Sequence, residues 1–287
     1  MLSVMRRALP SATLLCLYAA IAVAQVGIEL DSGRLSWQSG ETTLGGSDQW
    51  LQVRDLAAGD AFVPITVTGD ETAFTGVGDG LRFSGGWTGR SFARELTLTV
   101  TADPPRDRAL IVRVALPLEA VGWTWWDDMG TSRAIEAGKH YDRLTRWGGL
   151  REVSAYPCCA LGNDAAGVSA AVPVDEPQVF RLGYDATRQA LEAEFDIGLS
   201  PETVKFPCQS TIRLLVYGHD PAWGFRSAMQ RYYELFPQYA ERRVGPGGIW
   251  MIGLAPTTMA CPWDWGFRFE EHGLEHAGYN DAHGILT

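Results

Sequence analysis

The sequence predicts a mainly β protein, in which a sandwich of antiparallel sheets is followed by one connecting helix and the beginning of a (β/α)8 barrel. Three observations predict this fold. Apolar and polar residues alternate over much of residues 28–217, the apolar period becomes helical after His219, and a short strand without a polar face follows near residue 250. With 46% hydrophobic residues, the 287-residue chain suits one large β domain or two smaller units.

The first 24 residues have the pattern of a secretory signal peptide. Arg6 and Arg7 precede an apolar stretch from Ala8 to Val23, and a small-x-small pattern ends at Ala24. The stretch contains Pro10 and is shorter than the ~20 residues that span a bilayer, which favours cleavage over a membrane anchor. We therefore expect residues 1–24 to be removed and the mature chain to be secreted or periplasmic, without membrane attachment.

The charge of the chain argues against nucleic-acid partners. Loss of the two arginines takes the formal net charge from −10 to −12. Such an acidic balance repels phosphate backbones and anionic lipids alike. The sequence does not determine the oligomeric state.

Four cysteines remain after cleavage: Cys158, Cys159, Cys208 and Cys261. Export permits disulfides. A bridge from Cys158 or Cys159 to Cys208 and a set of buried free thiols are the two alternatives. The absence of a CxxC pair argues against a zinc site made of cysteines.

Residues 25–219 are predicted to form the β-sandwich. Leu96, Leu98 and Val100 alternate with threonines, as expected of a half-buried strand. Similar rows occur at residues 110–116, 191–197 and 212–216. Many strands without intervening helices indicate antiparallel sheets.

Residues 220–243 are predicted to form a connector helix that ends near Pro237. Asp220 is a suitable N-cap, and Pro221 fits the first helical position. The apolar residues recur at steps of four, three and four: Phe225, Met229, Tyr232 and Phe236. We expect this stripe to be buried between the sandwich and the barrel.

Residues 244–287 are predicted to begin the barrel. Ile249–Leu254 is an apolar run without a polar face, and a strand covered on both sides belongs to a parallel sheet or barrel. Only 33 residues follow Leu254, whereas a complete barrel takes ~250 residues. We expect the chain to end inside this domain.

Five sequence runs resemble a family of secreted bacterial glycosidases: Trp223-Gly224-Phe225-Arg226, Arg231-Tyr232-Tyr233-Glu234-Leu235-Phe236-Pro237, Gly248-Ile249-Trp250-Met251, Asp264-Trp265-Gly266-Phe267-Arg268-Phe269-Glu270-Glu271 and Asp281-Ala282-His283-Gly284-Ile285. They cover roughly residues 220–287, and the sandwich region matches only loosely. The resemblance implies an N-terminal super-sandwich of the galactose mutarotase type, a (β/α)8 barrel and activity on an oligosaccharide or polysaccharide. Family members continue past the last run, whereas this chain ends at Thr287.

The loop after the first barrel strand is the predicted substrate site. It places Asp264 between Trp263 and Trp265, on the face where barrels gather their active-site residues. Sugar rings pack on aromatic faces and carboxylates accept their hydroxyl hydrogens. The predicted substrate-binding residues are Trp250, Trp263, Asp264, Trp265, Glu270 and Asp281. The alternative is a capping Asp264 between two core tryptophans.

Glycoside hydrolysis needs two carboxyl groups beside the scissile bond. In a barrel these come from several strands, so no catalytic residue is assigned within this chain. Residues 123–128 of the sandwich form another aromatic and acidic cluster. It could bind a glycan, but we favour a structural role, with Trp123 and Trp125 in the core, Trp126 outward and a turn at the two aspartates.

Two further function classes stay open. The first is a secreted glycan-binding sandwich without catalysis. The second is a zinc peptidase, because His272, Glu275 and His276 spell the HxxEH pattern, although nearby glycines disfavour the helix that this pattern needs. His140 and His219 are interpreted as structural, and no metal or other cofactor is predicted.

Overall fold

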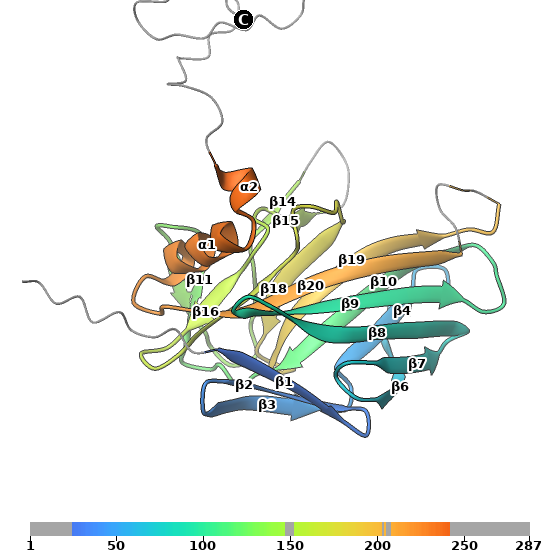
Figure 1. Cartoon of the computed structure of the whole chain (residues 1–287), viewed down its shortest axis with the longest axis horizontal. Helices are drawn as coiled ribbons and strands as arrows, with labels where there is room; N and C mark the ends of the chain where they lie inside the picture. Colours follow the sequence, from blue (N-terminus) through green and yellow to red (C-terminus); the bar gives the residue numbers. More distant parts are fainter. Residues whose placement is uncertain (1–24, 147–151, 203, 205–207, 242–287) are drawn as a thin grey trace, which may run out of the picture. The chain divides into compact units, whose positions relative to one another are not determined.

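The computed structural model describes residues 25–146, 152–202, 204 and 208–241, and it confirms a mainly β fold of antiparallel sheets (Figure 1). The chain divides into two compact units, one ending at Phe236 and one running from Pro237 to Thr287. The described part of the second unit contains the short helix α2 (Pro237–Ala240). The predicted signal peptide and barrel strand lie outside the described residues. No helix of the described part is long and apolar enough to cross a membrane.

The largest sheet has nine strands. In spatial order they are β12 (Ser132–Ala134), β11 (Thr124–Trp126), β16 (Ala160–Gly162), β17 (Gly167–Ala171), β20 (Gln209–His219), β9 (Ala93–Ala102), β8 (Leu81–Arg90), β7 (Phe74–Gly78) and β6 (Thr66–Gly69). Every neighbouring pair is antiparallel.

The second large sheet has six strands: β13 (His140–Asp142), β18 (Phe180–Asp185), β19 (Ala190–Leu199), β10 (Arg108–Pro117), β4 (Leu51–Asp55) and β5 (Val63–Pro64). Two smaller sheets complete the described β structure: β1 (Val26–Asp31), β2 (Arg34–Ser39) and β3 (Thr42–Ser47), and the hairpin of β14 (Leu144–Thr145) and β15 (Val153–Ser154).

The predicted alternation builds the sandwich core. Leu96, Leu98 and Val100 of β9 are fully buried in one hydrophobic cluster that takes residues from both large sheets. The other predicted rows contribute Leu110, Val112, Val114, Leu116, Leu191, Ala193, Phe195, Ile212, Leu214 and Val216 to the same cluster. The apolar side chains at every second position of these strands therefore meet between the two sheets.

The opposite face of the nine-stranded sheet is covered locally by the helix α1 (Gly224–Leu235). Figure 1 shows α1 lying over the end of the sheet where β11 and β16 run. The predicted helical stripe is confirmed, because Phe225, Met229, Tyr232 and Phe236 are buried in a second cluster with side chains of β16, β17 and β20. The expected contact of this stripe with a barrel involves residues outside the described ones.

The predicted start of this helix is wrong. Asp220 and Pro221 precede α1 in a turn, and the helix begins only at Gly224, after Trp223. The backbone carbonyl of Asp220 accepts hydrogen bonds from the amides of Trp223 and Gly224, and its side chain accepts one from Ala222 at 2.9 Å. Asp220 thus caps the turn rather than the α-helix.

Polar contacts hold α1 on the sheet from its middle to its C-terminal end. The hydroxyl of Tyr232 donates to the Val172 carbonyl at 2.8 Å, and the hydroxyl of Tyr217 donates to the Ala228 carbonyl at 3.0 Å. At the C-terminal end, the guanidinium of Arg90 lies 4.4 Å from the centre of the Phe236 ring. Buried hydroxyls with partners avoid the desolvation cost of unpaired ones, so these contacts orient the helix.

The cysteines of the described residues are free. Cys158 and Cys159 are buried on opposite faces of the nine-stranded sheet, one in each hydrophobic cluster, and Cys208 is partly exposed. The bridge to Cys208 is therefore not formed, and the alternative of free thiols holds for these three residues. Burial raises the pKa of the Cys159 thiol to about 12, so this thiol is protonated and unreactive at neutral pH.

We predict that Phe225→Ala lowers the free energy of unfolding by ~3 kcal/mol or more, because it leaves a cavity between α1 and the sheet. The matched control is Tyr233→Ala on the exposed side of α1, with an expected change within ~0.5 kcal/mol. Chemical denaturation of both variants measures the difference. Equal midpoints for the two variants would show that the stripe does not stabilise the fold.

Candidate functional site

The substrate-binding residues predicted in the barrel lie outside the described residues. These are Trp250, Trp263, Asp264, Trp265, Glu270 and Asp281, and the HxxEH residues His272, Glu275 and His276 lie there too. Their roles stay predictions. The candidate site among the described residues belongs to the first compact unit.

The aromatic cluster of β11 divides between the two faces of the sheet. Trp125 is buried in the sandwich core and donates from Nε1 to Asp127 at 3.2 Å. Asp128 accepts hydrogen bonds from the amides of Gly130 and Thr131 at 2.8 Å each, so the predicted turn is confirmed. These residues have the structural role that the sequence favoured.

Trp126 points to the other face, as predicted, but it is only partly exposed. Its ring meets the His219 ring edge to face, with centroids 5.8 Å apart. Gly224 at the start of α1 lies against the same indole, and a Cβ at this glycine would come within 2.2 Å of the Trp126 ring. Gly224 also has a φ of +48°, so both the close approach and the backbone conformation require glycine.

A pocket of about 260 Å³ lies beside Trp126. Three segments far apart in the sequence form it: the end of β11, the turn between β16 and β17, and the turn between β20 and α1. Its lining residues are Thr124, Trp126, Gly162, Asn163, Asp164, Ala165, Asp220, Pro221 and Ala222.

Strand register places four residues of this region on one face of the sheet. Thr124, Gly162, Gly167 and His219 are direct partners across four neighbouring strands, so their side-chain positions lie on that face. Neither glycine position has room for a side chain, because neighbouring atoms already lie there. A Cβ at Gly162 would meet the Ala166 carbonyl oxygen at 2.7 Å, and a Cβ at Gly167 would meet Nε2 of His219 at 2.7 Å.

The His219 side chain fills the space over Gly167, its cross-strand partner. The side chain is buried, and its Nδ1 is 2.8 Å from the hydroxyl of Ser169. Nε2 is buried and has no hydrogen-bond partner among the described residues. Burial lowers the pKa of His219 to about 3, so the imidazole is neutral at physiological pH.

The polar groups of the pocket have unused hydrogen-bonding capacity. Asn163 accepts the amides of Ala165 and Ala166 through Oδ1, both at 2.9 Å, which leaves the amino group of its side chain as a donor. One carboxylate oxygen of Asp220 accepts the amide of Ala222. Neither Asp164 nor Asp220 forms an ion pair with a described residue, and no Lys or Arg lines the pocket.

The sequence does not predict this pocket. It leaves glycan binding by the cluster at residues 123–128, which includes Trp126, as the less favoured alternative. It predicts Asp220 as a helix cap and assigns no role to Asn163 and Asp164. The local signal was the Gly162-Asn163-Asp164 run, which is typical of a turn. Which turns meet beside Trp126 depends on the strand order of the sheet.

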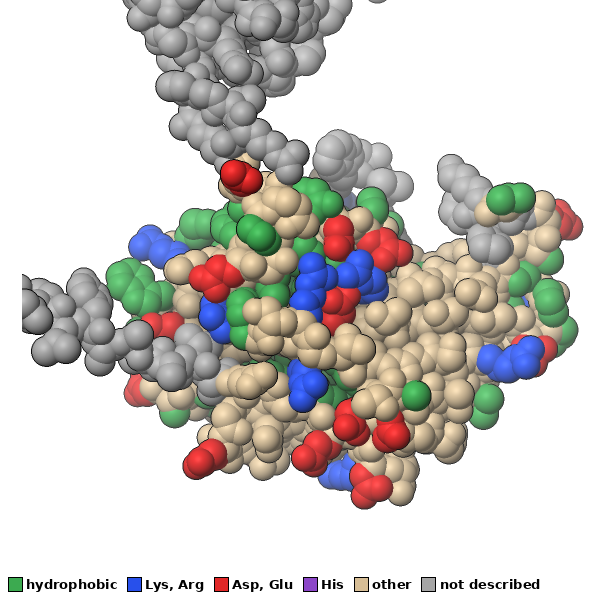
Figure 2. Space-filling view, in the orientation of Figure 1, with side chains coloured by type: hydrophobic (Ala, Val, Ile, Leu, Met, Phe, Trp, Pro, Cys, Tyr) green, Lys and Arg blue, Asp and Glu red, His purple; other side chains and the backbone are tan. Residues whose placement is uncertain are grey.

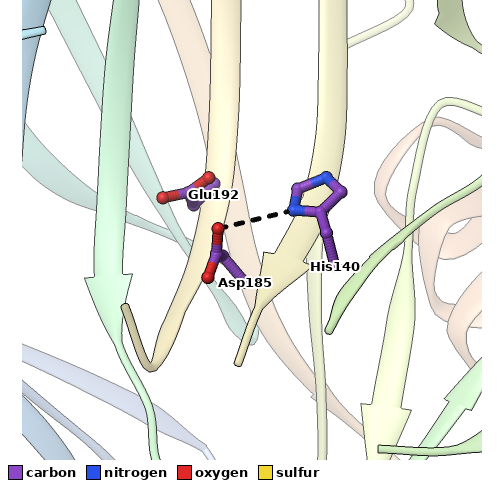
Figure 3. A group of neighbouring side chains, drawn as sticks. All are labelled: His140, Asp185 and Glu192. Carbon is purple, nitrogen blue, oxygen red and sulfur yellow. Dashed lines mark ion pairs between the residues drawn. The ribbon is translucent and has the colours of Figure 1, made fainter. Parts of the chain in front are cut away.

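A second group of interest is His140 with Asp185 and Glu192, on β13, β18 and β19 (Figure 3). Among the described residues, these three offer possible metal-ligand atoms within 4.8 Å of one another. However, the guanidinium of Arg188 pairs with Asp185 at 2.6 Å and with Glu192 at 2.7 Å. Because a cation already neutralises both carboxylates, the group is better explained as part of an ion-pair network than as a metal centre.

This network continues across the outer face of the six-stranded sheet. Arg113 pairs with Glu194 at 2.7 Å, and Arg181 pairs with Glu194 at 3.2 Å and with Asp196. Glu192, predicted on the polar face of its strand, is 3% exposed. The charged side chains cover one another, which explains why both faces of these strands are largely buried. On the face of the molecule shown in Figure 2, charged side chains of both signs are interspersed among the described residues.

The chain matches no protein-family model, and no curated protein matches it. Among solved structures, it is similar to a polysaccharide lyase, with 11% identity, a TM-score of 0.43 and coverage of 74% of this chain and 34% of the lyase. The Slr1438 protein from Synechocystis sp. PCC 6803 has 9% identity and a TM-score of 0.39, with 68% of this chain and 92% of that chain covered. The alpha-N-acetylgalactosaminidase NagBb from Bifidobacterium bifidum has 14% identity and a TM-score of 0.36, with 77% and 39% covered.

Two of these neighbours are carbohydrate-active enzymes, and this chain spans well under half the length of each. The similarities are too distant to assign a function to this chain.

We predict that the ion pair of His140 makes stability depend on pH. The hydrogen bond with Asp142, followed by the charges of Asp142, Glu192 and Asp185, raises the pKa of His140 above its ordinary value, although burial opposes the shift. A raised pKa means that the contribution is fully present below the unfolded pKa of ~6.5 and is lost as the pH rises through the folded pKa.

Since the His140 side chain is 47% exposed, the effect should have the size of a surface ion pair, ~0.2–1 kcal/mol. Denaturation of the wild type and of His140→Gln at pH 5.5 and 8.5 measures it. The wild type should lose more stability than the variant between these two pH values. The same pH dependence in both proteins would exclude His140 as its source.

Proposed function

We propose that this chain handles glycans as part of a carbohydrate-active enzyme of the glycoside hydrolase class. The observation that carries the proposal is the pocket beside Trp126, which combines an indole, two carboxylates without ion-pair partners and a free amide donor. Its ligand would be an oligosaccharide or polysaccharide. With the predicted signal peptide, the protein would act in the periplasm or outside the cell.

The residues of the pocket suit a sugar ring. Pyranoses present apolar C–H faces together with a rim of hydroxyls, and protein sites recognise this combination with aromatic surfaces and a few polar groups. Trp126 offers the aromatic surface. Asp220 and Asp164 offer acceptors for hydroxyl hydrogens, and Asn163 offers a donor.

The described part of the family resemblance has a structural explanation. Gly224 makes room for Trp126, while Phe225 and Tyr232 anchor α1 on the sheet. The runs at residues 223–226 and 231–237 thus belong to α1 and its flanking residues, the segment that follows the sandwich. This agrees with an architecture in which the sandwich precedes a catalytic domain, and bond cleavage would then depend on carboxylates of that domain.

A glycan-binding sandwich without catalysis is the second candidate, and the same pocket supports it. Turnover distinguishes the two functions. The glycoside hydrolase would release reducing sugar from its glycan, whereas the binding protein would retain the glycan unchanged.

We predict that Trp126→Ala weakens glycan binding by about five to thirtyfold, because losing a central aromatic contact costs ~1–2 kcal/mol. Methyl glycosides of glucose, galactose and mannose can be titrated while the protein is observed by NMR. The control is Trp223→Ala, which removes a tryptophan that is 63% exposed and does not line the pocket. Melting temperatures separate lost binding from lost folding. Unchanged affinity in a folded Trp126→Ala variant would exclude this pocket.

We also predict that Asp264→Ala in the completed enzyme weakens affinity for the glycan about ten to a hundredfold and thereby lowers its turnover substantially, with nearly unchanged thermal stability. The predicted position between Trp263 and Trp265 gives this carboxylate a role in holding sugar hydroxyls, and a charged hydrogen bond contributes ~1.5–3 kcal/mol. Asp60→Ala, at a fully exposed carboxylate of the sandwich, is the control. Normal kinetics in the Asp264 variant would exclude this loop from the substrate cleft.

A further inference from the structure

We propose that the pocket beside Trp126 selects its sugar by charge: it takes an uncharged or cationic pyranose and rejects anionic ones such as uronates and sulfated sugars. This inference rests on the proposed glycan-binding function and names the class of ligand for the same site. The inference follows from three features of the pocket: its carboxylates pair with no described cation, its polar groups have unused hydrogen-bonding capacity, and its volume is small.

The carboxylates of the pocket differ from those on the outer face of the six-stranded sheet. Along the six-stranded sheet, Glu192, Glu194 and Asp196 are all paired with arginines. Asp164 and Asp220 pair with no described cation, and no Lys or Arg is among the lining residues. Two uncompensated negative charges in one pocket repel an anion, with a strength that depends on solvent screening.

The neutral groups of the pocket do not compensate for these charges. His219, whose ring contacts Trp126, is uncharged at physiological pH and therefore adds no positive potential. The face of an indole such as Trp126 carries negative electrostatic potential and attracts cations. Uronates and sulfated sugars would bring an anion beside two carboxylates, where the side-chain donors of the lining residues are all neutral: the Asn163 amide, the Thr124 hydroxyl and the Trp126 indole N–H.

The same groups match hydroxyls and amines. A carboxylate only accepts hydrogen bonds, so Asp220 and Asp164 require donors on the ligand. Sugar hydroxyls are donors, and a protonated amino sugar adds a charged donor. The affinity of otherwise matched sugars should therefore increase as the ligand charge goes from −1 to 0 to +1.

The volume restricts the ligand to a short piece of glycan. At about 260 Å³ the pocket is smaller than the ~300–1,000 Å³ of typical small-molecule sites. We expect it to hold a single ring. The discriminating test can therefore use monosaccharide glycosides.

The test titrates the whole mature chain with methyl glucuronide, methyl glucoside and methyl glucosaminide, and with the matching galacto series, at low ionic strength. The glucuronide should bind at least tenfold more weakly than the glucoside, and the glucosaminide at least as tightly as the glucoside. Raising the salt concentration should narrow the differences. The double variant Asp164→Asn with Asp220→Asn keeps the side-chain shapes and should bring the three affinities within about threefold of one another. Asp128→Asn, outside the pocket, should leave the wild-type order intact.

The possible failures are distinguishable. If the glucuronide binds as tightly as the glucoside while Trp126→Ala abolishes both, the pocket stands and selection by charge is overturned. Selection by charge is also overturned if the double variant Asp164→Asn with Asp220→Asn still discriminates between the glucuronide and the glucoside as strongly as the wild type does. If no sugar of either series binds the wild type, or if a folded Trp126→Ala variant binds as the wild type does, the proposed function of the pocket is itself overturned.

Discussion

The structure depends on the burial of β20 from both sides. Ile212, Leu214 and Val216 fill the core between the two large sheets, while the intervening Leu215 and Tyr217 belong to the cluster beneath α1. One strand therefore holds two hydrophobic layers together. A polar residue at any of these positions would be buried without water on either side, and this is why the strand has a nearly continuous apolar run before His219.

The outer face of the six-stranded sheet is also largely buried, but by paired charges and not by an apolar layer. That face carries Arg113, Arg181 and Arg188, and each pairs with carboxylates of β18 or β19. Most of these charged groups are less than a third exposed, although Arg188 is 44% exposed, and short hydrogen bonds offset the desolvation. A network of this kind contributes less to net stability than an apolar layer would. It disfavours shifted strand registers, because the pairs of Arg113 and Arg181 with Glu194 join neighbouring strands and a shift by one residue would separate them.

These two faces show how far the sequence predicts the structure. The rows at residues 96–100 and 212–216 were predictable because their period is local, and so was the stripe of α1 from Phe225 to Phe236. The burial of Glu192 was not predictable from the alternation in its strand, because it depends on Arg188 in the turn before β19 and on Arg113 of the neighbouring β10. The start of α1 was misplaced because an Asp-Pro pair suits a turn as well as a helix cap, and the deciding contact, Gly224 against Trp126, joins residues about a hundred positions apart.

That contact also links the helix to the candidate site. The pocket beside Trp126 has one wall from the turn that leads into α1, so it is complete only when the helix lies on the sheet. Gly224 allows the helix to start directly against the indole, and the turn from Asp220 to Ala222 then forms one side of the pocket, opposite the turn that begins at Gly162. Since Phe225 and Tyr232 hold the helix down by burial, the free energy that docks α1 also positions Asp220 beside Trp126. The pocket and the α1 segment that follows the sandwich therefore form one structural unit.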